Sequence, residues 1–295
     1  MGSGKLARSW ELTKQAWSIL KADKRLLIFP LISGTLVVAL MVSTIGGGIA
    51  ALVTAADAGT GKFNFEAFME QYGPLVYVGL FLLYFVTYFI ITYFQSALLA
   101  CAMKRLDGDT PTILGGFRAA NSRLPQILAW ALVNATVGVA LQMLQDRVGW
   151  IARLFIGAAS IVWNIATFFV VPVLVLEGVG PIEAVKRSAG VVKKTWGESL
   201  ITQVGFAAVM SWIGLLLFLG VAGSGIGLAI ALDNPWPVAI MIPLALLSIV
   251  LLAIVQSAMK TLLIAATYKF ATSGVAAGSF DAQMLQDVFG PKKRR

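Results

Sequence analysis

The chain has no histidine, only one cysteine and few charged residues, and each shortage excludes a class of function. Without histidine, catalysis by an imidazole and metal sites built on imidazole are excluded. The lone Cys101 lies in an apolar run, so no internal disulfide can form. Charged residues make up 13% of the chain and hydrophobic residues 58%, whereas a soluble domain carries about 25% charged residues. The composition therefore predicts a membrane protein.

Six long apolar segments carry most of the hydrophobic residues. A helix needs about 20 apolar residues to cross the hydrocarbon core, and every backbone amide in that core needs an internal partner. We therefore predict an all-α, polytopic bundle of six transmembrane helices with amphipathic helices at the interface. The expected spans are Leu26–Val53, Leu75–Met103, Leu124–Met143, Leu154–Leu176, Leu200–Ala222 and Val238–Met259, the last extending as far as Phe270 if its helix continues.

The basic residues are distributed unevenly between the stretches that flank these spans. All but three of the 23 Lys and Arg residues, namely Lys62, Arg147 and Arg153, fall in four stretches that alternate with three base-poor ones. Since Lys- and Arg-rich loops stay in the cytoplasm, the bias predicts six crossings with both termini cytoplasmic. The net charge is +9. Because the bases flank apolar spans, we expect anionic lipid headgroups as partners and no nucleic acid.

Three of the basic stretches have the periodicity of helices that lie on the membrane surface. In the first, Leu6, Trp10, Thr13, Trp17 and Leu20 form one stripe, with basic and polar side chains on the opposite arc. Pro181 begins the third, whose expected stripe is Ile182, Val185, Ala189, Val192 and Trp196. In the second, Thr110 is the expected N-cap. The candidate lipid-interface residues are Trp10, Lys14, Trp17, Arg187, Lys193 and Trp196.

Two readings of these surface helices stay open. In the simpler one, they only seat the bundle at the interface. In the other, they form a functional collar or a docking surface at the cytoplasmic face, for lipid, for a protein partner or for a second copy of the chain.

Two short patterns recur and indicate an internal repeat. Arg-Ser-x4-Lys-x2-Trp occurs at 8–17 and at 187–196, and Gln-Ser-Ala occurs at 95–97 and 256–258. We predict a single membrane domain, 1–270, built of three parallel units, each a surface helix followed by a helix hairpin. The expected units are 1–105, 106–178 and 179–270, and a basic cytoplasmic tail, 271–295, follows them.

Four polar residues are candidates for intramembrane sites: Gln95, Asn164, Gln256 and Lys260. The amides either form hydrogen bonds between helices or line a polar constriction near the pseudo-axis. Lys260 extends to the surface if the sixth span ends there. If the helix continues, Lys260 lies within the membrane and becomes a candidate contact for an anion or a headgroup.

The sequence holds no metal-ligand cluster, catalytic triad or paired intramembrane carboxylates. We therefore expect no catalytic residue, no cofactor, no metal and no enzymatic activity. The first functional hypothesis is a non-enzymatic membrane protein that binds lipid or organises the inner leaflet. The alternative is a channel or transporter for a small anionic or amphipathic solute, with a path between the hairpins.

Several positions carry a family resemblance: Pro172, Glu177, Pro181, Arg187-Ser188 and Trp196, together with 9–12 and 23–30 near the N-terminus. On these the chain resembles an uncharacterised family of bacterial multi-pass membrane proteins. More distantly, Pro172–Ser188 is similar to the membrane domain of some bacterial glycerophosphodiester phosphodiesterases. The resemblance implies a bacterial cytoplasmic (inner) membrane location and no catalytic residue.

Overall fold

Helices make up all the regular structure in the part of the chain that the computed structural model describes, residues 3–55, 65–195 and 200–274. They are α1 (Ser3–Ala22), the 3-10 turn η1 (Lys24–Leu27), α2 (Ile28–Ala55), α3 (Phe65–Leu106), α4 (Ile113–Asn121), α5 (Leu124–Arg147), α6 (Trp150–Ala166), α7 (Val170–Pro172), the π-helical turn η2 (Val173–Glu177), α8 (Pro181–Thr195), α9 (Leu200–Leu232) and α10 (Trp236–Ser273).

Six segments are long and apolar enough to cross a membrane, which confirms the predicted all-α, multi-pass class. Two helices are much longer than a bilayer requires. The 42 residues of α3 extend about 63 Å and the 38 residues of α10 about 57 Å, at 1.5 Å per residue. The hydrocarbon core is only about 30 Å thick. Each of these helices therefore extends beyond the hydrocarbon.

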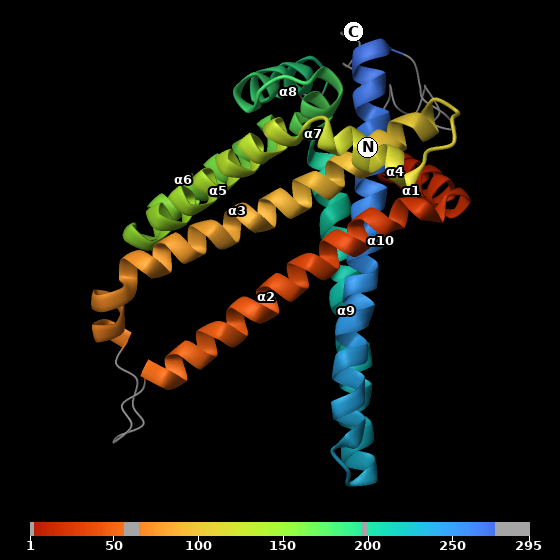
Figure 1. The fold of residues 1–295 in the computed structure, drawn as a ribbon. Coiled ribbons are helices and arrows are strands. Elements are labelled where there is room, and N and C mark those ends of the chain that lie inside the picture. Colours follow the sequence, from red (N-terminus) through yellow and green to blue (C-terminus); the bar gives the residue numbers. More distant parts are fainter. Residues whose placement is uncertain (1–2, 56–64, 196–199, 275–295) are drawn as a thin grey trace.

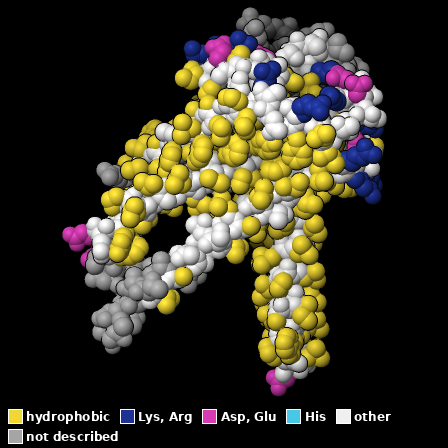
Figure 2. Space-filling model, in the orientation of Figure 1, with side chains coloured by type: hydrophobic (Ala, Val, Ile, Leu, Met, Phe, Trp, Pro, Cys, Tyr) yellow, Lys and Arg dark blue, Asp and Glu magenta, His cyan; other side chains and the backbone are white. Residues whose placement is uncertain are grey.

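The helices converge at one end of the molecule and separate at the other (Figure 1). The helix α3 packs against α2, α4 and α5, whereas α9 packs chiefly against α10. The surface helices α1, α4 and α8 lie at the convergent end. Beyond it, α2 diverges from the α9–α10 hairpin and leaves an open wedge between them (Figure 2). We call this space the wedge.

The buried core lies at the convergent end. Its largest fully buried side chains include Phe29 of α2, Leu98 of α3, Phe169 just before α7, and Leu262 of α10. Elsewhere many Leu, Ile and Val side chains on the long helices are exposed. In a bilayer lipid tails cover such side chains as well as another helix would. The fold therefore needs protein packing mainly where the helices meet.

The fourth span is not the continuous helix that the sequence predicted. It breaks after Ala166, and the hydroxyl of Thr167 donates to the carbonyl of Trp163 at 2.8 Å. Pro172 has no backbone N–H, so the carbonyl of Phe168 cannot receive the usual helical hydrogen bond. The chain then continues through α7 and η2 to Glu177.

Two helix boundaries also differ from the prediction. Thr112, not Thr110, is the N-cap of α4, and its hydroxyl accepts from the N–H of Gly115. The helix α9 continues ten residues past its predicted end to Leu232. A Cβ on Gly225 would lie 2.6 Å from Cβ of Met241, so glycine here permits close packing of α9 against α10.

In element order, a surface helix is followed by two long helical segments three times along the chain, and the internal repeat itself remains a prediction. The groups are α1–α2–α3, α4–α5–α6 with its extension to η2, and α8–α9–α10. The unit limits 1–105, 106–178 and 179–270 remain predictions. Of the expected tail, 271–273 belong to α10, Gly274 caps it, and 275–295 lie outside the described residues.

Candidate functional site: a basic end and an adjoining polar pocket

The basic side chains gather at the convergent end, over the surface helices and the ends of α3 and α10 (Figure 2). We call this region the basic end. It consists of α1, α4, α8 and the ends of α3 and α10 that meet them. Some of its basic side chains form ion pairs and others do not.

Glu177 connects two elements within the basic end. Its carboxylate accepts hydrogen bonds from the hydroxyl of Tyr268 on α10 and from the guanidinium of Arg187 on α8. Arg187 also pairs with Glu183 one turn earlier, at 2.9 Å. Hydrogen bonds to Glu177 and Glu183 raise the pKa of Arg187 above its ordinary value. Arg187 is therefore part of the structure of this end and is not free for lipid.

Arg123 and Lys269 make two further connections. The Nε of Arg123 donates to the carbonyl of Val175 at 3.1 Å, where η2 leaves its carbonyls free. Lys269 near the end of α10 pairs with Asp107, just past the end of α3. Arg123 thus binds a free carbonyl of η2, and the pair of Lys269 with Asp107 joins the end of α10 to the chain just past α3.

The remaining bases of this end are different. Besides Lys21, whose ammonium lies over the Trp17 ring, six are exposed and have no ion pair with an acid among the described residues: Lys24, Arg25, Lys104, Arg118, Lys186 and Lys193. Their charge is available to an anionic surface.

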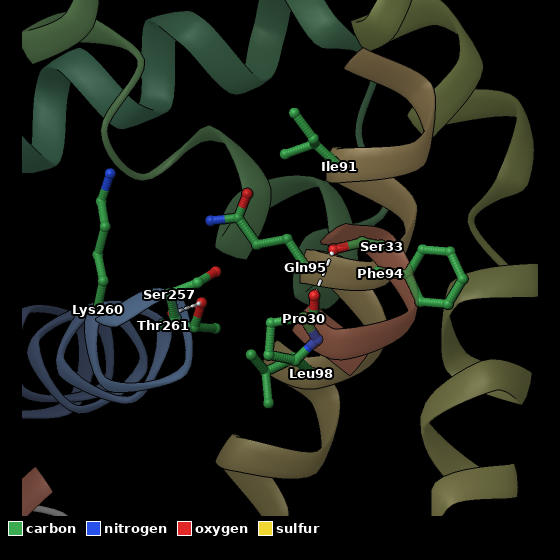
Figure 3. Close-up of a pocket in the computed structure, with 9 residues that line it drawn as sticks. All are labelled: Pro30, Ser33, Ile91, Phe94, Gln95, Leu98, Ser257, Lys260 and Thr261. Atoms are coloured by element: carbon green, nitrogen blue, oxygen red, sulfur yellow. Dashed lines mark hydrogen bonds between the residues drawn. The ribbon is translucent and has the colours of Figure 1, made fainter. Parts of the chain in front are cut away.

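A pocket of about 150 Å³ lies where α2, α3 and α10 meet. Its polar lining consists of Ser33, Gln95, Ser257, Lys260 and Thr261, and the rest is apolar (Figure 3). Gln95 and Ser257 point into the space between α3 and α10, and the ammonium of Lys260 extends at its edge. We call this the α2–α3–α10 pocket.

The helix α10 does not end at Lys260. Lys260 is 24 residues after Trp236, the first residue of the helix, which corresponds to about 36 Å. The helix continues past Lys260 to Ser273. The Lys260 side chain is exposed and lines the pocket from α10.

The family comparison matches residues 75–278 to a family of unknown function, DUF6159. The match covers well over half of the chain. The protein belongs to this family. The matched region contains α4, α8 and the α3 and α10 sides of the pocket, including Gln95 and Lys260. No curated protein matches the chain, and the resemblance to the membrane domain of phosphodiesterases remains an expectation.

The predicted interface residues of α1 take different environments. The ring of Trp17 is 40% exposed and carries the ammonium of Lys21 at 5.6 Å from its centroid. Lys14 pairs with Glu11 at 3.1 Å. Thr13 and Leu20 of the predicted stripe are buried, and Ala16 is buried beside them, whereas Trp17 is exposed. The structure describes only the helical backbone of Trp10.

On α8 the buried face is rotated from the predicted stripe. Ala184, Ser188 and Val192 are buried, whereas Ile182 is 71% exposed. The predicted stripe was chosen by apolar residues alone. It therefore left out Ser188, which is buried because its hydroxyl accepts a hydrogen bond from the N–H of Phe169. Lys193 is exposed on this helix, and Trp196 lies outside the described residues.

The three candidate amides do not line one cavity. Gln95 lines the pocket, Gln256 is half-buried on α10 outside its lining, and Asn164 is exposed on α6. The sequence analysis missed Ser33 and Ser257. Ser257 belongs to the second Gln-Ser-Ala pattern, which directed attention to the glutamine instead. Within the described ranges, no group of His, Cys, Asp and Glu is placed to hold a metal ion.

Proposed function

We propose that the protein is a non-enzymatic membrane protein of the bacterial cytoplasmic membrane that binds anionic lipid headgroups of the inner leaflet through its basic end. The carrying observation is the set of six exposed, unpaired bases at the end where the surface helices gather. Each such base near an anionic leaflet contributes about 1 kcal/mol. Both termini are cytoplasmic in this proposal.

The arrangement of Trp17 and Lys21 supports the same orientation. An indole that is partly exposed beside a base is typical of the boundary between headgroups and acyl chains. The surface helix α1 lies at the same end as α4 and α8. We infer that the three helices lie along the inner leaflet and hold lipid headgroups between them.

The proposal is tested by the lipids that the full-length protein retains. Reconstituted with equal amounts of phosphatidylglycerol and phosphatidylcholine, it should be enriched in phosphatidylglycerol when retained lipids are counted by native mass spectrometry. The triple variant Lys24→Gln, Lys104→Gln, Lys193→Gln should lose about fivefold in this preference for each charge at low salt. Arg153→Gln, in a base-poor stretch, is the control and should change nothing.

Equal retention of both lipids would contradict the proposal. The alternative, a channel or transporter with a path between the three hairpins, predicts a different outcome. In that case the same liposomes should show a flux of small anions well above that of protein-free liposomes.

A further inference from the structure

Lys260 brings an unbalanced positive charge to the α2–α3–α10 pocket. No acid contributes to the lining, and Lys260 has no ion pair with any residue that the structure describes. A cation near the hydrocarbon is costly unless an anion or water accompanies it. The charge of the pocket therefore favours an anionic ligand.

Each polar side chain of the pocket can donate a hydrogen bond. Ser33 donates to the carbonyl of Pro30 at 3.3 Å and Thr261 to that of Ser257 at 3.0 Å, each within its own helix. Beside the Lys260 ammonium, two groups remain without a hydrogen bond to the described residues: the Gln95 amide and the Ser257 hydroxyl. A ligand rich in acceptors, such as a phosphate, complements these groups.

The volume of the pocket admits a phosphate group. By the same measure of volume a single water needs about 10–15 Å³, so a pocket of about 150 Å³ has room for a phosphate group.

Apolar side chains continue from the pocket along two of its helices. By helical spacing, Val37 and Leu40 share the face of Ser33 on α2. Val250 precedes Ser257 by seven residues on α10 and shares its face. These helices diverge beyond the pocket and border the wedge (Figure 2). A ligand with a phosphate and a hydrocarbon tail fits this arrangement, in which a polar pocket opens onto apolar helix faces. A soluble anion would leave the wedge empty.

We propose that the α2–α3–α10 pocket binds the phosphate of one anionic phospholipid and that an acyl chain of this lipid lies in the wedge between α2 and α10. Lys260 supplies the charge, and Gln95 and Ser257 donate hydrogen bonds to phosphate oxygens. This site rests on the proposed function and assigns it one specific position, separate from the exposed bases of the basic end.

The test is photocrosslinking of the full-length protein in vesicles of phosphatidylglycerol and phosphatidylcholine. A trace of phosphatidylglycerol carries a diazirine on its acyl chain, and mass spectrometry locates the adducts. We expect adducts at Val37, Leu40 and Val250 or their neighbours, which border the wedge. Lys260→Gln should reduce them about tenfold, because hydrogen bonds to charged groups are lost. Arg153→Gln, which replaces an exposed base on α6 in a base-poor stretch, is the matched control and should leave these adducts unchanged.

A second variant separates charge from folding. Lys260→Arg keeps the positive charge and should retain most of the crosslinking. Equal adducts in the wild type and Lys260→Gln would overturn the site, and so would an Arg variant as weak as the Gln variant. Excess inorganic phosphate should compete far less than unlabelled phosphatidylglycerol. Equal competition would mean a site for a soluble anion and would also overturn the proposal.

The outcomes for the site and for the proposed function are distinguishable. If the protein prefers phosphatidylglycerol overall but gives no Lys260-dependent adduct, the pocket proposal fails and the proposed function stands. If it shows no preference for anionic lipid in either assay, both fail.

Discussion

The hydroxyl of Ser188 on α8 accepts a hydrogen bond of 2.9 Å from the backbone N–H of Phe169, at the break in the fourth span. Both residues are fully buried. The helix break frees this N–H from its usual carbonyl partner, and a buried N–H without a partner is costly. A surface helix therefore completes the hydrogen bonding of an irregular segment at the end of a span.

Ser188→Ala should lower the free energy of unfolding by about 1–3 kcal/mol, because it removes the hydroxyl that accepts from the buried N–H of Phe169. An unfolding titration of the purified protein in mixed micelles measures the change. Ser122→Ala is the control, since this exposed hydroxyl only donates to the carbonyl of Ala119. It should change stability by less than about 0.5 kcal/mol. Equal effects of the two variants would contradict a specific role for Ser188.

Gly178→Ala should lower the free energy of unfolding by about 2 kcal/mol or more. An alanine is strained in the left-handed backbone conformation of this residue, and its Cβ would displace a charge-assisted hydrogen bond. Gly178 has φ of +68°, and a Cβ there would lie 2.2 Å from Nη1 of Arg123. Arg123 would have to move and lose its bond to Val175.

A double-mutant cycle tests this cause. In an Arg123→Ala background, Gly178→Ala should cost less, since only the backbone strain remains. Gly180→Ala, with nothing within 4 Å of its added Cβ, should be nearly neutral. Full additivity of the changes at 123 and 178 would mean that the close approach does not matter.

Tyr268→Phe should lower the free energy of unfolding by about 1.5–3 kcal/mol, as expected for a lost hydrogen bond to a charged group. The change removes the hydroxyl that donates to Glu177 and keeps the ring that packs 5.7 Å from Phe169. Glu183→Gln affects only an exposed pair with Arg187 and should cost less than about 1 kcal/mol. Both values come from the same unfolding titration, and a larger effect at Glu183 would contradict the central position of Glu177.

The proposed orientation predicts a labelling pattern in whole cells. Cys101 is the only cysteine and is buried, so it should contribute little background to thiol labelling. A cysteine at Asn234, in the short connection between α9 and α10, should react with a membrane-impermeant maleimide from outside. Lys193→Cys on α8 should react only after the cells are permeabilised. The reverse pattern would show that the basic end faces outward.

The hydropathy pattern predicted the number and order of the spans because each segment can satisfy its own backbone only as a helix. It did not predict the break after Ala166, which depends on Pro172 and on a partner 19 residues away, Ser188. It also ended α9 at Ala222, since glycines read as a loop. Packing of Gly225 against Met241 keeps that region helical.

The candidate site was predictable only in part for a similar reason. The sequence singled out Gln95 and Lys260 because a polar group among apolar residues is visible in one segment at a time. Their meeting in one pocket with Ser33 and Ser257 depends on where α10 packs against α2 and α3. No periodicity within one helix contains that information.

The sequence by itself determined the membrane class, the six helices and the separation of charge, since all three follow from local composition and the cost of burying a backbone or a charge in lipid. Only the tertiary structure decided which bases are used internally, as Arg187 and Lys269 are, and which stay free, as Lys193 does. It also decided that Lys260 lines a pocket. These outcomes depend on contacts between helices distant in sequence, where lipid and protein compete equally for apolar surface.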